Sequence, residues 1–182
     1  MYLSSSLLSW NHEGSYGPLA KPGIPNQVIS GEGKLKFAGQ QIIYGYLPAA
    51  HTNGDIFLYF PILDTLVAGG AVTTGQWPVM DIRQGGWIGG LVNAYGILAS
   101  IVSADTTVIP AHGPVTNGTE IIRMRNMYSG LHLDLAEQLN PGMGWDDVRE
   151  MGLLAPHEAQ FGDSSFFVET AHRSLQMAYV PD

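Results

Sequence analysis

The sequence contains no cysteine among its 182 residues. This absence excludes a disulfide framework, a thiolate metal site and a cysteine nucleophile, and it leaves the redox compartment open. Charged residues are also scarce, at 13% of the chain, and the formal net charge is -8. A weakly charged, acidic surface argues against nucleic acid and against anionic membranes as partners.

The chain also lacks a hydrophobic run of the roughly 18 residues that a membrane-spanning helix needs. Its first residues contain neither a basic segment nor a long apolar stretch, so they make a poor signal peptide. We therefore expect a soluble protein, with the cytoplasm slightly favoured as its location. The length of 182 residues and the hydrophobic content of 45% fit a single domain over residues 1–182.

Glycine and proline are frequent, with 23 and 11 copies, and they divide the chain into short segments. Residues 1–33 form an irregular N-terminal segment in which residues 2–10 are predicted as a short helix or a frayed end. Polar and apolar residues alternate over 34–37, and a mostly apolar segment returns over 42–47 after a turn. This pattern predicts a hairpin. Residues 56–60 are apolar throughout, so we expect a central strand that is buried on both faces. Residues 65–68 are the next predicted strand.

Helical periodicity begins after this group of strands. Apolar residues recur at spacings of three and four over residues 87–102 and again over residues 121–139, with a strand at 106–109 between them. Asn117 and Glu120 have the spacing of a capping box at the start of the second helix. A short helix capped by Asp146 and a final helix over residues 164–179 complete the α/β class prediction.

Two histidines are candidate metal ligands because each lies where glycine or proline turns the backbone beside an apolar strand. They are His51 and His112. Neutral imidazole is the commonest protein ligand for zinc and also suits iron and manganese. Two ligands alone hold such a metal poorly, since catalytic zinc usually takes three protein ligands and a water. The alternative is that both histidines bond to local backbone.

The other polar candidates have more ordinary interpretations. Asp55 follows Gly54 at the start of a strand, where its carboxylate could brace the loop or orient His51 as a second-shell partner of a metal site. Gly69-Gly70 and Gly85-Gly86 lack the spacing of a phosphate-binding loop and are read as tight turns. The remaining histidines are expected at the surface, namely His12, His132, His157 and His172.

Three ordered segments together resemble the metallo-β-lactamase-fold hydrolases. They are Ala-His-Thr-Asn-Gly-Asp at residues 50–55, Leu-Val-Ala-Gly-Gly at 66–70, and Val-Ile-Pro-Ala-His-Gly-Pro-Val at 108–115. Residues 77–81 and 85–90 resemble a further segment found in one branch of that family. The resemblance extends over roughly residues 10–175 and implies a four-layer αββα sandwich with one or two metal ions at one edge of its two sheets.

The resemblance also implies roles for individual residues. His51 corresponds to a ligand of the first metal, and His112 corresponds to a ligand of the second. The aspartate that bridges the metals in the family falls on Gly70, which has no side chain to coordinate with. The family's H-x-H-x-D-H motif normally precedes His51, and this sequence contains no H-x-H. We therefore expect a partial sandwich without the N-terminal half-sheet, and a metal that binds weakly or not at all.

The function implied by the resemblance is metal-hydroxide hydrolysis of an ester, thioester or lactam-type bond in a small-molecule substrate, with zinc, iron or manganese as the metal. With two of the usual ligands remaining, the chain is interpreted as a truncated or degenerate hydrolase. The alternative is a non-catalytic binding or structural remnant of the fold, completed by self-association into a homo-oligomer. A third hypothesis is that a separate chain supplies the missing half. The sequence does not select a substrate.

Overall fold

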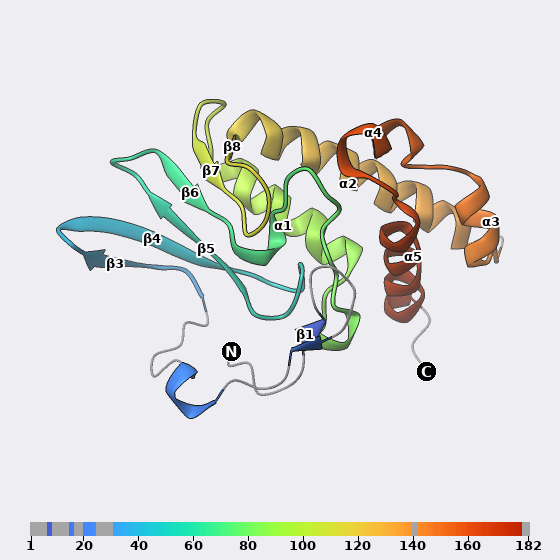
Figure 1. The fold of residues 1–182 in the computed structure, drawn as a ribbon, viewed down its shortest axis with the longest axis horizontal. Coiled ribbons are helices and arrows are strands. Elements are labelled where there is room, and N and C mark those ends of the chain that lie inside the picture. Colours follow the sequence, from blue (N-terminus) through green and yellow to red (C-terminus); the bar gives the residue numbers. More distant parts are fainter. Residues whose placement is uncertain (1–6, 9–14, 17–19, 25–30, 140–141, 180–182) are drawn as a thin grey trace.

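The computed structural model describes residues 7–8, 15–16, 20–24, 31–139 and 142–179. Its main feature is a six-stranded sheet with its strands in the order in which they follow along the chain (Figure 1). All neighbouring strands of this sheet are antiparallel except β6 and β7, which are parallel. The strands are β3 (Gly33–Phe37), β4 (Gln40–Leu47), β5 (Asp55–Phe60), β6 (Thr65–Val67), β7 (Thr107–Ile109) and β8 (Thr116–Asn117). A parallel pair needs a long crossover, which contains the first helix here.

The helices follow the sequence pattern closely. The helices are α1 (Ile88–Ile101), α2 (Gly118–Leu139), α3 (Trp145–Glu150), α4 (Glu158–Phe161) and α5 (Ser165–Tyr179). Short 3-10 turns are η1 (Lys21–Gly23), η2 (Gly69–Ala71), η3 (Ile82–Gln84) and η4 (Ala155–His157). The side chain of Asn117 accepts a hydrogen bond from the backbone N–H of Glu120 at 3.2 Å, as the predicted cap requires. No helix among the described residues is long and apolar enough to cross a membrane.

The hydrophobic core lies between one face of the sheet and the helices (Figure 1). The register pairs Tyr59 with Leu66 and Leu66 with Val108, so their side chains share that face. Leu66 and Val108 are fully buried, as are Leu91 and Tyr95 on α1. Each such aliphatic side chain contributes about 1.5–3 kcal/mol through burial.

The opposite face of the sheet is apolar and partly exposed. Leu35 on β3, Ile56 on β5 and Ile109 on β7 are 41%, 38% and 39% exposed. The prediction that residues 56–60 are buried on both faces is therefore wrong, because Phe57 is the only fully buried member of that run. Helices cover only one face of the sheet within the described residues, and the continuous apolar pattern alone does not reveal this.

Two local predictions also need correction. Asp146 does not cap α3, because Gly144 is the capping residue and its N–H donates to the Asp147 carboxylate at 2.9 Å. Leu7–Leu8 pairs with Ser15–Tyr16 as the strands β1 and β2, so these two residues are not helical. The rest of residues 2–10 lies outside the described part of the chain. The short helix α4 was not predicted, since four residues carry too little periodicity to detect.

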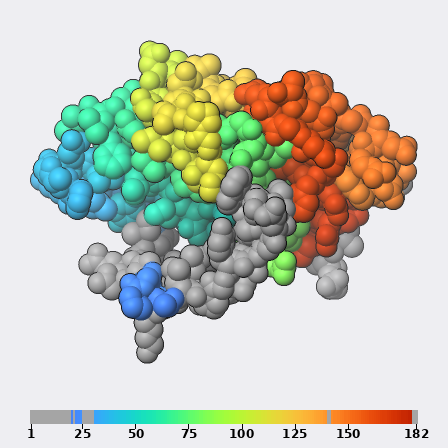
Figure 2. Space-filling view, in the orientation of Figure 1, coloured from blue at the N-terminus to red at the C-terminus, as the bar shows by residue number. Residues whose placement is uncertain are grey.

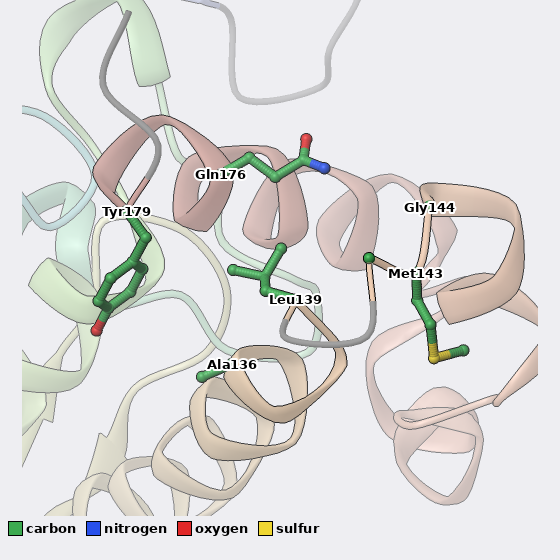
Figure 3. A pocket seen from close by; sticks show the side chains of 7 residues that line it. Ala136, Leu139, Met143, Gly144, Gln176 and Tyr179 are labelled. Carbon is green, nitrogen blue, oxygen red and sulfur yellow. The ribbon is translucent and has the colours of Figure 1, made fainter.

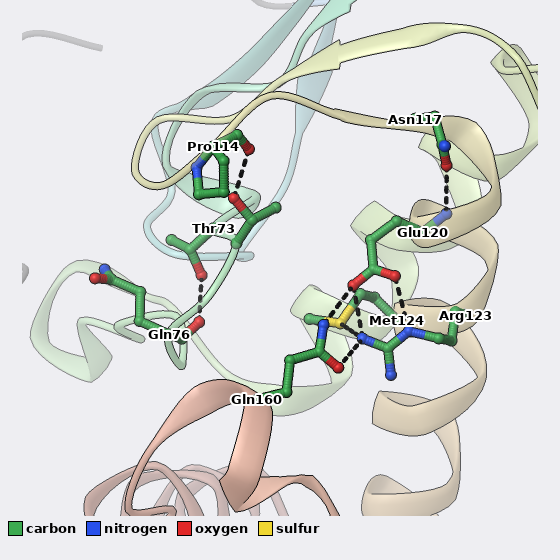
Figure 4. A network of polar contacts seen from close by, with 9 residues as sticks. Thr73, Gln76, Pro114, Asn117, Glu120, Arg123, Met124 and Gln160 are labelled. Carbon is green, nitrogen blue, oxygen red and sulfur yellow. Dashed lines mark hydrogen bonds and ion pairs between the residues drawn. The ribbon is translucent and has the colours of Figure 1, made fainter.

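The C-terminal helices form the end of the molecule opposite strands β3 and β4 (Figure 2). A polar cluster joins α4 to α2 (Figure 4). Arg123 donates to both carboxylate oxygens of Glu120 at 2.7 and 2.6 Å and to Gln160 at 3.0 Å. The hydrogen bonding to Glu120 raises the pKa of Arg123. Because this cluster is partly exposed, it stabilises the fold by about 1 kcal/mol at most.

Candidate functional site

Strand topology brings three loops to one edge of the sheet. β6 and β7 are parallel, so their carboxyl ends meet there. β5 is antiparallel to β6, so its first residue lies at the same edge. The loop before β5 carries His51, the loop after β6 carries Gly70, and the loop after β7 carries His112. Such edges are where α/β proteins commonly place ligands.

The His51 loop is held in place by backbone hydrogen bonds to the segment that precedes α1. The carbonyl of His51 accepts from the N–H of Asp81 at 2.9 Å. The N–H of Asn53 donates to the carbonyl of Gln84 at 2.8 Å. These bonds satisfy loop backbone groups and fix the position of the imidazole.

Close backbone approach at this loop depends on two glycines. Ala49 adopts a left-handed conformation with φ 55°, and its carbonyl accepts from the Trp87 N–H at 3.1 Å. A Cβ at Gly90 would overlap the Ala49 carbonyl, and one at Gly86 would overlap the His51 carbonyl. The absent side chains therefore allow the loop to lie directly against the start of α1.

Asp55 contacts both the backbone of its own loop and the imidazole of His51. One carboxylate oxygen accepts from the Thr52 N–H at 2.6 Å, and the other lies 3.4 Å from Nδ1 of His51. The Asp55 residue is only 7% exposed. Histidines that bind metals commonly direct their second ring nitrogen to a carboxylate, and this arrangement leaves Nε2 of His51 as the nitrogen available for a ligand.

The His112 loop is fixed by the segment that follows η2. The carbonyl of His112 accepts from the Thr74 N–H at 3.0 Å. The hydroxyl of Thr74 donates at 2.7 Å to the carbonyl of Pro114, which follows His112 by two residues (Figure 4). Thr73 forms a parallel bridge with His112, and its hydroxyl donates to the Gln76 carbonyl at 3.1 Å. The loop therefore has a defined position relative to β6 and β7.

His51 and His112 line the same small cavity of 30 Å³. It offers room for a water molecule or an ion. Gly70, Thr73, Gln76 and Val79 complete its lining. Sequence reasoning identified the two histidines and Gly70 but missed the other three residues. They lie in an irregular stretch with no periodic pattern, so their position depends on the backbone bonds just described.

The described residues do not complete a metal centre. Among them, no group of three or more His, Cys, Asp and Glu side chains is arranged to hold a metal ion. The two imidazoles are one protein ligand short of a catalytic zinc site. A Cβ at Gly70 would lie 2.6 Å from Nδ1 of His51, so any side chain there would displace the imidazole.

The remaining histidines differ from expectation in one case. His172 is 1% exposed, with Nε2 3.3 Å from the Met143 carbonyl, so its predicted surface location is wrong. It faces the core because α5 turns this side toward α3. His132 is partly buried against the edge of Trp87, and desolvation lowers its pKa. His157 is partly exposed, and His12 lies outside the described residues.

A larger cavity of 690 Å³ lies at the C-terminal ends of α2 and α5 (Figure 3). Its side chains are mostly small or apolar, and Gln176 and Tyr179 supply the polar groups. It contains no carboxylate, imidazole or ammonium group among its described residues, and it shares no lining residue with the histidine cavity. We therefore assign the candidate chemistry to the smaller cavity.

No family model and no curated protein matches this sequence. Solved structures do match. A metallo-β-lactamase from Pontibacter korlensis superposes with a TM-score of 0.50 at 19% identity, over 59% of this chain and 50% of that one. The B3 metallo-β-lactamase BLEG-1 gives 0.50 at 18% identity, over 57% and 48%. A double mutant of the sec-alkyl sulfatase PisA1 gives 0.59 at 14% identity, over 86% and 27%.

These matches concern the fold alone, because all three identities are below 20%. The chain spans about half the length of the two β-lactamases that it matches. The sulfatase covers more of this chain than the β-lactamases do, but the chain corresponds to 27% of that protein.

Proposed function

Since the chain has the fold of part of a metallo-β-lactamase, we propose that it supplies one wall of a metal-dependent hydrolase site, with His51 and His112 as the ligands that it contributes. The observation that carries this proposal is that the two histidines line one cavity although they lie in separate loops. The proposed reaction is hydrolysis of an ester, thioester or lactam-type bond in a small molecule. The matched structures, which are named as β-lactamases and an alkyl sulfatase, support a hydrolase of this fold and do not select among these bonds.

Two histidines are too few ligands for a catalytic metal ion, which limits the activity expected of the chain alone. Two imidazoles support weak metal binding, and the further ligands come from groups outside the described residues. Within the chain, Asp55 orients His51, and the bond from Asp81 holds the His51 backbone. We expect hydrolysis only once the site is completed.

Zinc titration of the purified chain tests this proposal. The expected result is a binding heat that is lost in His51→Ala and in His112→Ala. His157→Ala is the matched control, because His157 does not line the cavity and should leave binding unchanged. Isothermal titration calorimetry measures the binding heat. Absence of binding by the parent chain, or full binding by either cavity variant, would contradict the proposed role of the two histidines.

A second candidate is a non-catalytic module completed by self-association. It is favoured by the exposed apolar face of the sheet, where Phe37 is 71% exposed beside the partly exposed Leu35 on β3, and the partly exposed Ile56 lies on β5. Exposed apolar surface on one side of a sheet commonly marks an interface. In this case the urea midpoint should rise with protein concentration, because association stabilises the folded chain.

Two lysine variants test whether the chain self-associates through the exposed face of the sheet. Ile56→Lys places a charge on the exposed sheet face and should abolish the dependence on concentration, whereas Leu133→Lys, on α2 at 65% exposure, should preserve it. Sedimentation velocity gives an independent mass. A monomer with a concentration-independent midpoint in the parent chain would rule out self-association.

A further inference from the structure

Helix α5 packs into the core with one face and lines a cavity with another. Its buried face carries Phe167, Ala171 and Leu175, which belong to the hydrophobic core. A second face lines a cavity of 460 Å³ together with residues 80–83. The lining residues of α5 recur at spacings of one, three and four, so they form a continuous stripe along the helix. A volume of this size is typical of small-molecule sites.

The cavity has an apolar part. Met80 is 1% exposed, which places it at the inner side. Phe166 and Met177 are 41% and 64% exposed on the α5 stripe. Methionine side chains are flexible and adapt to aliphatic or aromatic ligands. Met80 from the segment before α1, and Phe166 and Met177 from α5, together supply the surface for an apolar ligand segment.

Two arginines lie at the same cavity, although the whole chain has only eight basic residues and a net charge of -8. Arg83 has no ion pair with any residue in the described ranges. Arg173 lies 3.9 Å from Glu169, which is a long, exposed pair that contributes little. Asp81 is 3% exposed, and its carboxylate accepts from the Gln84 N–H at 3.3 Å. Glu169 also lines the cavity, with its side chain 39% exposed beside Arg173. Arg83 is therefore the accessible cation of this cavity that no carboxylate of the described residues neutralises.

This cavity is separate from the histidine cavity. Val79 lines the histidine cavity, and the adjacent Met80 lines the α5 cavity, so their side chains lie on the two sides of one segment. The backbone of Asp81 bonds to His51 in the same segment. A ligand beside α5 therefore contacts the outer side of the wall that forms the candidate metal site, and does not itself reach the two histidines.

We propose that the α5 cavity binds a medium-chain fatty monocarboxylate. Its carboxylate lies at Arg83 and Arg173, and its aliphatic chain lies over Met80, Phe166 and Met177. A planar guanidinium matches a carboxylate through paired hydrogen bonds. The flexible thioethers accommodate the tail without a fixed shape. This inference is independent of whether the chain binds metal.

Octanoate, octanol and acetate are the probes that test the proposal by calorimetry, each below any micellar concentration. Octanoate is expected to bind at one site per chain, and octanol and acetate about tenfold or more weakly, because one lacks the charge and the other lacks the tail. Arg83→Gln should weaken octanoate binding about tenfold. Arg149→Gln, on α3 with its side chain 55% exposed, is the matched control and should bind as the parent does.

Several outcomes would overturn the proposal. They are the absence of saturable octanoate binding, equal binding of octanol and octanoate, and equal affinities of Arg83→Gln and the parent chain. A second variant, Met177→Gln, removes apolar surface at an exposed position and should weaken octanoate binding while leaving the unfolding midpoint unchanged. Equal octanoate binding by that variant would also contradict the proposed place of the tail.

Discussion

Replacing Gly90 with alanine is expected to destabilise the chain by about 3 kcal/mol or more, which is a large part of the stability of an ordinary domain. A Cβ at this position of α1 would overlap the carbonyl of Ala49 in the His51 loop. The backbone carbonyl cannot move aside as a flexible side chain would, so either the helix or the loop must shift. Urea unfolding followed by circular dichroism measures the loss.

Gly96→Ala is the matched control, because Gly96 lies in the same helix and a Cβ there meets nothing within 4 Å. Alanine is favoured over glycine inside a helix by about 0.5–1 kcal/mol, so this variant should be more stable than the parent. If Gly90→Ala and Gly96→Ala had the same effect, the close contact between α1 and the His51 loop would be wrong.

Trp77→Ala is expected to cost about 3–5 kcal/mol, the range for removal of a large buried aromatic side chain. Trp77 is 6% exposed, and its ring centroid lies 4.8 Å from Phe161 and 5.2 Å from Phe167. Its indole N–H donates to the Gly162 carbonyl at 2.8 Å. The side chain thus joins the segment beside the histidine cavity to α4 and α5, and its loss should loosen both.

Trp77→Phe separates the two contributions. It keeps an aromatic ring in the core but removes the hydrogen bond to Gly162, which should add about 0.5–1.5 kcal/mol to the cost of the smaller ring. Thermal and urea unfolding of both variants give the comparison. A loss below about 1 kcal/mol in Trp77→Ala would contradict the packing of this indole.

Local sequence patterns predicted most of the helices and strands, but they did not predict which faces of these elements are buried. Periodicity located α1, α2 and α5 because each buries one stripe of apolar residues. The apolar run from Ile56 to Phe60 correctly predicted a strand. The prediction that both faces of this strand are buried was wrong, because burial depends on what covers each face of the sheet. The burial of His172 was missed for the same reason: the side of α5 that faces α3 is set by tertiary packing.

The candidate site could be predicted in part because its loops follow from strand order. His51 and His112 stand beside recognisable strands, and the parallel pairing of β6 and β7 brings their loops together. Thr73 and Gln76 could not be found in this way, because an irregular segment places them through individual hydrogen bonds. The cavity beside α5 was missed because its residues come from two segments that the sequence does not connect.

The measurement that tests the central claim most directly is zinc binding by the double variant His51→Ala/His112→Ala, compared with the parent and both single variants. If the two imidazoles hold one ion, each single change already removes the site, and the double change should weaken binding no further. This non-additive result is the expected one. Losses in binding free energy that add, or a single variant that keeps one separate zinc site, would show that His51 and His112 do not share one site.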